Sequence, residues 1–266
     1  MTTKAFEHQH KISDKTFEVE VRSSSESVFS EDSTTSTLLD DASFHPDTTF
    51  HIAARGIGVW RLPLPSSEVE IPIYRNDGSL AYTSTREKRS SGNCVLSHPK
   101  IGDLVSTTYF FGPNREPVLK LLQAPGEPDG EANSINIKGK WVSRSTAFIM
   151  GDGRVFEWSY AHTKDSQGTR VKLIVLRQQE QSEVKMKGDK GGRILAQLVR
   201  GKETRAEGSK RCTAGNGGQL MLDQDATSHL DEAVIIATCL MMLKKEIDRR
   251  RTIQFMMLSG AASGGS

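Results

Sequence analysis

Cysteine is scarce in this sequence. Only three occur among 266 residues, at Cys94, Cys212 and Cys239, and no two of them form a Cys-x-x-Cys pair. An odd, widely spaced set argues against a disulfide framework and against a zinc site, since both need paired or clustered thiols. The seven histidines are also scattered. The sequence therefore predicts reduced thiols and no metal site.

Long apolar runs are missing as well. The longest uncharged one, residues 233–243, has eleven residues, whereas a membrane-spanning helix needs about 20. Residues 1–8 also lack the apolar centre of a secretory signal. These two absences predict a cytoplasmic or nuclear protein that is not secreted and has no transmembrane segment.

Motifs that would identify a reaction are absent too. There is no GxSxG elbow, no HExxH, and the glycine clusters at 188–192 and 214–218 match neither a P-loop nor a dinucleotide fingerprint. Cys94 and His98 would lie about 13 Å apart on one strand, too far for a thiolate pair. We therefore expect no catalytic residue and no cofactor. A deep pocket lined by Glu157, His162 or Cys94 would instead indicate an enzyme with a site at a barrel rim.

Charge divides the chain into two parts. Residues 1–47 carry four basic and ten acidic residues, with a Ser/Thr-rich tract at 23–37, while the whole chain has a net charge of +2. Residues 1–47 have too few apolar groups to offset the entropy of ordering, so they are predicted to be a disordered acidic tail. The remainder is basic, which permits an anionic partner without requiring one.

Residues 48–258 are predicted to form one β domain. Short β-type runs alternate there with turn residues, and Asp77-Gly78 and Asp152-Gly153 supply the positive φ values of tight hairpins. Such hairpins indicate a meandering antiparallel sheet. The thirteen expected strands are 49–53, 57–62, 69–75, 80–84, 94–98, 104–111, 118–123, 135–138, 146–150, 154–161, 170–176, 194–200 and 219–222.

The run Ala233–Leu243, AVIIATCLMML, is apolar on every side of a helix. Such a helix must be buried on every side, so it is threaded into a barrel or clamped between sheets. Ser228, with Asp231 three positions later, is predicted to cap it. The chain is expected to return to water from Lys244, to form a last apolar patch near residues 253–258, and to end in a flexible tail at 259–266.

These features together resemble a known family. Many short strands, the two Asp-Gly hairpins, the aromatic strand at 153–158 and the apolar C-terminal helix resemble the tubby C-terminal-like superfamily, which includes LURP-one-related proteins and phospholipid scramblases. The segment 141–251 also resembles a group of filamentous-fungal proteins. The resemblance implies an antiparallel barrel of about twelve strands around a central apolar helix. Neither the phosphoinositide-binding residues of tubby proteins nor the calcium-binding segment attributed to scramblases can be placed on individual positions here.

The strongest candidate site is a basic stretch. Lys185, Lys187, Lys190 and Arg193 surround a glycine turn between two expected strands, and such a loop can bind an anionic lipid headgroup or can simply be a solvated hairpin. We expect a non-enzymatic module that binds anionic phospholipid headgroups at a membrane surface. A regulatory or scaffold protein that binds a protein partner, through its tail or barrel surface, is the alternative. Nucleic acid is not an expected partner, because no recognition motif is present, and the oligomeric state stays open.

Overall fold

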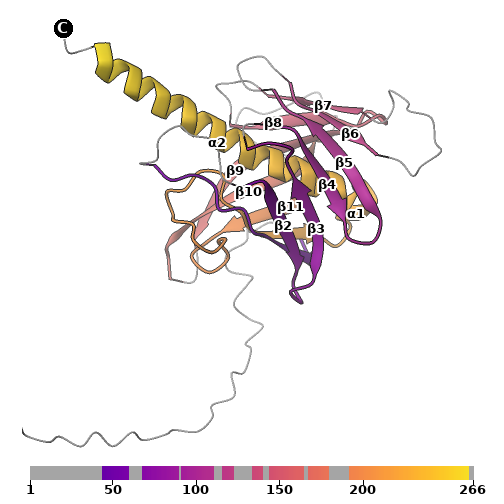
Figure 1. Cartoon of the computed structure of the whole chain (residues 1–266). Helices are drawn as coiled ribbons and strands as arrows, with labels where there is room; N and C mark the ends of the chain where they lie inside the picture. The colour runs from indigo at the N-terminus through magenta and orange to yellow at the C-terminus, as the bar shows by residue number, and fades with distance from the viewer. Residues whose placement is uncertain are drawn as a thin grey trace, which may run out of the picture. The chain divides into compact units, whose positions relative to one another are not determined.

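The computed structural model describes residues 44–59, 68–89, 91–110, 116–122, 134–139, 144–164, 167–179 and 192–263. Within these residues, twelve strands close into an antiparallel barrel and two helices follow the last strand (Figure 1). The strands are β1 Pro46–Ile52, β2 Glu70–Arg75, β3 Leu80–Thr85, β4 Cys94–His98, β5 Gly102–Thr108, β6 Val118–Leu121, β7 Ser134–Lys138, β8 Thr146–Ile149, β9 Val155–Lys164, β10 Arg170–Gln179, β11 Arg193–Arg200 and β12 Gly218–Asp223. The helices are α1 Ala226–His229 and α2 Glu232–Ser263.

The barrel is a simple meander in which each strand pairs with the next along the chain. It closes between β1 and β12, where Thr49 pairs with Met221. The predicted fold class, an antiparallel barrel of about twelve strands with a buried C-terminal helix, is confirmed. The expected strand at 57–62 is wrong in its described part, because Ile57 forms only an isolated bridge with Ala214.

Two tight turns confirm the Asp-Gly signals. Gly78 has a φ of +80° and Gly153 a φ of +85°, values that side chains with a Cβ rarely adopt. The preceding aspartates stabilise both turns: Asp77 Oδ1 accepts a hydrogen bond of 2.9 Å from the Ser79 amide, and Asp152 Oδ1 accepts one of 3.0 Å from the Arg154 amide. Local sequence therefore sets the hairpin register here.

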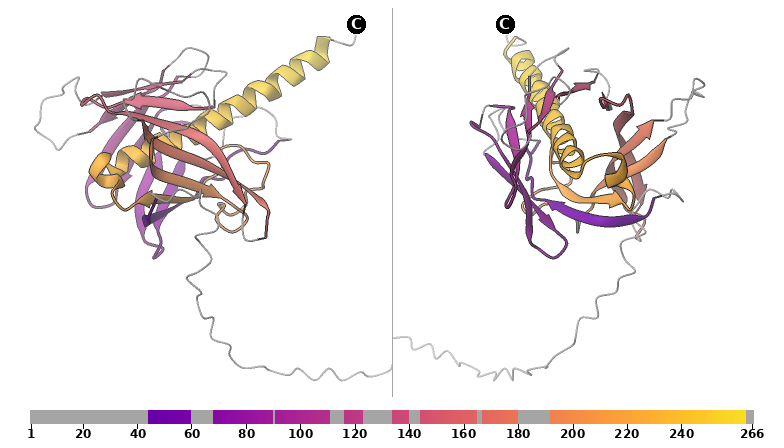
Figure 2. Two further views of the ribbon diagram at one scale, coloured as in Figure 1. Left: turned by 180° about the vertical axis from the view of Figure 1, so that it is seen from behind. Right: turned by 90° about the vertical axis from the view of Figure 1, so that its right-hand side faces the viewer.

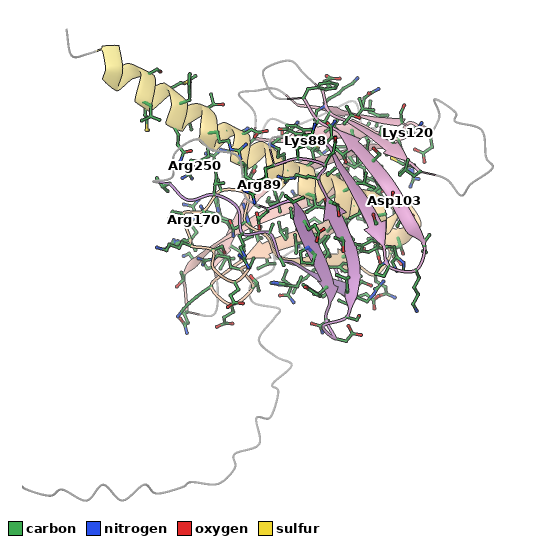
Figure 3. All side chains as sticks on the ribbon, viewed as in Figure 1. Lys88, Arg89, Asp103, Lys120, Arg170 and Arg250 are labelled. Carbon is green, nitrogen blue, oxygen red and sulfur yellow. The ribbon has the colours of Figure 1, made fainter. Side chains whose placement is uncertain are left out.

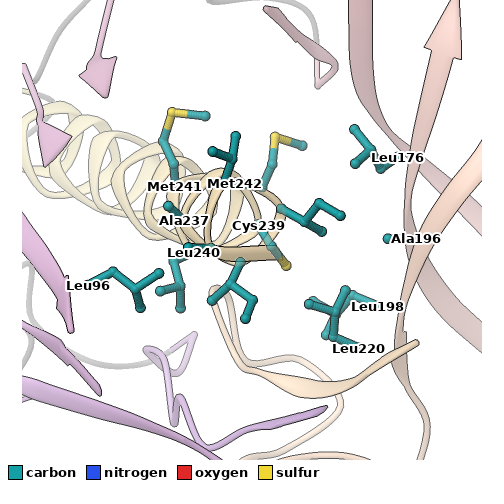
Figure 4. Close-up of a cluster of buried hydrophobic side chains, with 14 of the residues drawn as sticks. Leu96, Leu176, Ala196, Leu198, Leu220, Ala237, Cys239, Leu240, Met241 and Met242 are labelled. Carbon is teal, nitrogen blue, oxygen red and sulfur yellow. The ribbon is translucent and has the colours of Figure 1, made fainter. Parts of the chain in front are cut away.

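Helix α2 runs through the barrel, as Figure 2 shows. Every residue from Ala233 to Leu243 is buried, so the predicted central helix is confirmed. Figure 4 shows its side chains between strand residues such as Leu96, Leu198 and Leu220. A polar contact joins the helix to the barrel wall at this level: Trp158 Nε1 donates to Thr238 Oγ1 at 2.9 Å, and both side chains are fully buried.

The cap of α2 differs from the expected one. Asp231 Oδ1 accepts hydrogen bonds from the amides of Ala233 at 2.8 Å and Val234 at 3.4 Å, so Asp231 itself caps the helix. Ser228 belongs to the short helix α1, and its hydroxyl donates to the Asp225 carbonyl. The Ser228 prediction was wrong because a break at Leu230 separates α1 from α2.

The expected return to water at Lys244 is also wrong. Lys244, Ile247 and Asp248 are all buried, and the surface of α2 is fully exposed only from Phe255, about three turns beyond Leu243. Three of the charged residues in these turns have partners of opposite charge, which allows their burial: Lys244 and Arg251 pair with Asp248, and Glu246 pairs with Arg200. The helix then runs on to Ser263, into the segment 259–266 that composition assigned to a tail.

Strand β10 is covered on both faces, which fits its nearly continuous apolar sequence. Ile174 and Leu176 pack in the cluster that contains α2, whereas Leu173 and Val175 belong to a second cluster with Phe44. Phe44 lies just before β1, which begins at Pro46, so the described β domain starts slightly before the predicted boundary at residue 48. Residues 1–43 lie outside the described residues.

Candidate binding surface where the helix leaves the barrel

The two ends of the barrel have opposite charge. We call the end where α2 begins the entry end and the end where α2 leaves the exit end. Among described residues the exit end carries nineteen Lys or Arg and eight Asp or Glu, while the entry end carries six and nine. The exit end comprises the described parts of 53–59, 68–70, 86–94, 108–118, 138–146, 163–172, 199–218 and 244–259, and the entry end those of 44–48, 74–80, 98–104, 119–136, 149–157, 176–194 and 222–233.

Individual charged residues can be assigned to the two ends of the barrel in the figures. In Figure 3, Arg89, Arg170 and Arg250 lie toward the side where α2 emerges, and Lys120 and Asp103 lie toward the opposite end. Arg89 and Arg170 are exposed. A basic end with exposed guanidinium groups attracts an anionic surface, whereas the acidic end repels it.

One wall of the exit end is a group of charges on one face of α2. Lys244 Nζ lies 2.7 Å from Asp248 Oδ1, and Arg251 Nη1 lies 3.7 Å from the same oxygen. Lys244 Nζ also lies 5.2 Å from the centre of the Tyr109 ring. Burial, followed by the negative charge of Asp248, raises the pKa of Tyr109. Two cations therefore share one carboxylate, which leaves this face with a positive charge.

The other side of α2 is held by a second ion pair. Arg200 donates to both carboxylate oxygens of Glu246, at 2.6 and 3.0 Å, and the Gly215 amide donates to Glu246 at 2.9 Å. Burial alone would raise the pKa of Glu246, but Arg200 and Gly215 hold it below its ordinary value. Gly215 has a φ of +72°, and a Cβ there would lie 2.3 Å from Ile247 Cγ1. The glycine cluster at 214–218 thus lets the β11–β12 connection approach α2.

Lys245 lies between these two groups. Its side chain is partly buried, and a Cβ on Gly139 would lie 2.9 Å from its Nζ. Burial first, and then the nearby Arg249, lower the pKa of Lys245 to about 8, against an opposing effect of Glu116. The cost of charging Lys245 therefore comes first from its burial, and the positive charge of Arg249 adds to it.

A cavity of about 750 Å³ opens beside α2 at the exit end. Three parts of the chain line it: the β3–β4 connection, the end of β5 and one face of α2. The described lining residues are Ser91, Gly92, Asn93, Thr108, Tyr109, Phe110, Lys244, Asp248, Arg251, Thr252 and Phe255. Two buried atoms in this lining, Arg251 Nε and Asp248 Oδ2, have no hydrogen-bond partner among the described residues.

Beyond the charged turns, α2 projects from the barrel with an apolar surface. Figure 2 shows its C-terminal part extending past the strands. Phe255, Met256 and Met257 are 65%, 62% and 70% exposed, and Ile253 and Leu258 are also exposed. We call residues 253–258 the apolar tip. Gln254 alone is buried there, because it donates to the carbonyls of the β1–β2 connection. The predicted patch near residues 253–258 is therefore present on a projecting helix.

The basic loop chosen from sequence stands apart from this surface. Lys185, Lys187 and Lys190 fall in the β10–β11 connection, outside the described residues. Arg193 lies at the entry end, where its Nη2 pairs with Asp223 at 2.7 Å and with Asp225 at 2.9 Å. The structure therefore does not bring Arg193 near the exit-end cations, and its charge is balanced locally.

The enzyme alternative gains no support from the cavity lining. Neither Glu157 nor His162 is among the described residues that line the 750 Å³ cavity, and Cys94 lines a neighbouring pocket of about 10 Å³. The described residues include no group of three or more His, Cys, Asp or Glu that could hold a metal. No described helix is both long enough and apolar enough to span a membrane.

Sequence reasoning missed the exit end because its residues come from six connections, the strand ends beside them and one helix. Only α2 carried a readable signal, a basic stretch at 244–251 followed directly by apolar residues at 253–258. Comparison of the chain with protein-family models, curated proteins and solved structures finds no match.

Proposed function

We propose that this protein is a non-enzymatic module that docks on membrane surfaces rich in anionic phospholipid, with the exit end of the barrel facing the lipid. The observation that supports this best is the order of surfaces along α2. A basic end surrounds the helix, and an apolar tip projects from the middle of that end. Electrostatic attraction by the basic end and insertion of the apolar tip would act together on an anionic membrane surface.

The charges supply attraction at a distance. Basic residues near an anionic surface contribute about 1 kcal/mol each, and the contribution decays within a Debye length, about 8 Å at physiological salt. With nineteen cations and eight anions among its described residues, the exit end outweighs the entry end as a docking face. Binding that depends on this surface weakens as salt rises.

The apolar tip supplies the second contribution. Exposed side chains of Phe255, Met256 and Met257 lie on consecutive positions of a projecting helix. An apolar patch of this kind, surrounded by charge, indicates an interaction site rather than a solvent-facing surface. Insertion of the tip among the headgroups removes its apolar area from water without the helix crossing the bilayer.

Co-sedimentation with phosphoinositide-containing vesicles tests the proposal. Wild-type protein should pellet at low salt and less at high salt. The double substitution Arg89→Glu/Arg170→Glu should weaken binding more than about tenfold, since it removes two exposed cations and adds two anions. Lys100→Glu/Lys120→Glu, which makes the same charge change at the entry end, should bind as the wild type does.

A separate variant tests the contribution of the apolar tip. Met256→Ser/Met257→Ser removes exposed apolar area, so it should weaken pelleting without changing the thermal midpoint by more than a few degrees. Failure of wild-type protein to pellet at low salt would contradict the lipid proposal and favour a protein partner for the exit end. If binding is lost only when Lys185, Lys187 and Lys190 are replaced by Glu, the β10–β11 connection is the docking site instead.

The proposal includes membership of the tubby C-terminal-like superfamily. A closed barrel of twelve antiparallel strands around a C-terminal helix is the architecture that this resemblance implies, and the described residues have it. It also includes a cytoplasmic or nuclear location, where the exit end would meet the anionic leaflet of a membrane.

A further inference from the structure

We propose that the cavity between α2 and the end of β5 is a binding site for one single-chain amphiphile with a phosphate or carboxylate head. This inference extends the proposed membrane docking, because it assigns a specific ligand site to the same end of the barrel. The ligand can come from a bilayer or from solution, and the two sources share this chemistry.

The size and shape of the cavity suit a small molecule. Its volume of about 750 Å³ lies within the range of about 300–1,000 Å³ that small-molecule sites occupy. The barrel interior cannot accept a ligand of this size at the level of residues 233–243, because α2 fills it there. The cavity beside the emerging helix is therefore the place where a chain can lie against the protein.

The lining has a charged part and an apolar part. Lys244, Asp248 and Arg251 lie on one face of α2 at intervals of four and three residues, and together carry a positive charge. Phe110 is 43% exposed and Phe255 is 65% exposed on the cavity walls. An anionic head at Arg251 and an apolar chain along the two phenylalanines match this division.

The charge of the lining supports the choice of an acidic head. The Arg251 side chain is 16% exposed, so an anionic head can reach part of it, although its Nε is enclosed by the protein. A charged oxygen is the strongest acceptor for a guanidinium group. A cationic head is disfavoured, since Lys244 and Arg251 already share the single carboxylate of Asp248.

Decyl phosphate, used as monomer below its micelle concentration, is the probe for this site. Titration calorimetry should show that decyl phosphate binds to the full-length protein. Decanol, which lacks the phosphate head, and inorganic phosphate, which lacks the apolar chain, should each bind at least about tenfold more weakly. Arg251→Gln should lower the affinity for decyl phosphate about tenfold or more, because a charge-assisted hydrogen bond is lost. Thr108→Trp should block the site by filling it, since Thr108 is an exposed lining residue on a strand.

Met256→Ser/Met257→Ser is the matched control, because neither residue lines the cavity. This variant should bind decyl phosphate as the wild type does and should bind vesicles more weakly. No binding of decyl phosphate by wild-type protein, or equal binding by Arg251→Gln and Thr108→Trp variants with unchanged thermal midpoints, overturns the site. Binding of decyl phosphate without vesicle pelleting keeps the site and overturns the membrane proposal.

The source of the ligand is decided by a transfer assay. Protein incubated with vesicles that contain a fluorescent single-chain phosphate lipid is separated from them by flotation, and the lipid in the soluble fraction is measured. Recovery of lipid with wild-type protein but not with Thr108→Trp identifies a bilayer source. Binding of decyl phosphate without transfer identifies a free amphiphile as the ligand.

Discussion

Replacement of Glu246 by glutamine tests the ion pair that holds α2 where it leaves the barrel. The Arg200 side chain is 3% exposed, and its guanidinium donates two hydrogen bonds to the Glu246 carboxylate. Glutamine keeps the size of the side chain and one carbonyl acceptor but removes the negative charge. Arg200 would then be a buried cation without a compensating anion.

The expected loss of stability is large for this reason. Removing one partner of a buried ion pair costs about 3–5 kcal/mol, because the other charge stays buried and uncompensated. For a domain of about 150–250 residues, 1 kcal/mol corresponds to about 2–4 °C in thermal midpoint. Glu246→Gln should therefore lower the midpoint by about 6–20 °C.

The double variant separates the charge effect from other causes. In Arg200→Met/Glu246→Gln both charges are gone, so the double variant should be more stable than Glu246→Gln alone. Thermal unfolding followed by tryptophan fluorescence is a suitable assay, because Trp158 is fully buried beside α2. Asp225→Asn is the control, since Asp225 is 59% exposed in its pair with Arg193 and should contribute less than about 1 kcal/mol.

The same pair predicts a pH dependence. The pKa of Glu246 is lower in the folded protein than its ordinary value of 4.5. Its stabilising contribution is therefore present above that value and is lost as the pH falls through the folded-state pKa. Between about pH 5 and 3 the wild type should lose more stability than Arg200→Met/Glu246→Gln.

For the thermal midpoint, a Glu246→Gln variant that unfolds within 2 °C of wild type would refute the reasoning on this ion pair.

Three further predictions concern α2. Ile236→Ala should cost about 2–5 kcal/mol in urea unfolding, because Ile236 is fully buried, whereas Met257→Ala on the exposed tip should change stability by less than about 0.5 kcal/mol; equal effects would contradict the threaded helix. Thr238→Val should cost about 1–3 kcal/mol, since it leaves Trp158 Nε1 without its acceptor, and Thr238→Ser should retain most of that contact. The pKa of Lys245 is lowered from 10.5 to about 8 in the folded protein, so between these two pH values the unfolded chain binds more protons than the folded one. The free energy of unfolding of the wild type should therefore rise relative to that of Lys245→Met between about pH 8 and 10.5. A difference that stays constant over this range would contradict the prediction.

The sequence determined the local elements and the position of the helix. Asp-Gly pairs at Asp77 and Asp152 place φ-positive turns, and alternation in β9 places Phe156 and Trp158 on the buried face. An apolar run such as Ala233–Leu243 has only one physical solution, burial on every side. These properties depend on a few neighbouring residues, and a single sequence records them directly.

Tertiary structure alone decided where the charges meet. Arg200 and Glu246 are separated by 46 residues, and Tyr109 approaches Lys244 only because β5 ends beside the emerging helix. The prediction that α2 returns to water at Lys244 failed because charged residues of this segment have partners: Lys244 pairs with Asp248 one turn along the same helix, and Glu246 pairs with the distant Arg200. The basic end of the barrel is likewise assembled from connections spread over the whole domain, because antiparallel strands return the chain to the same end at every second turn.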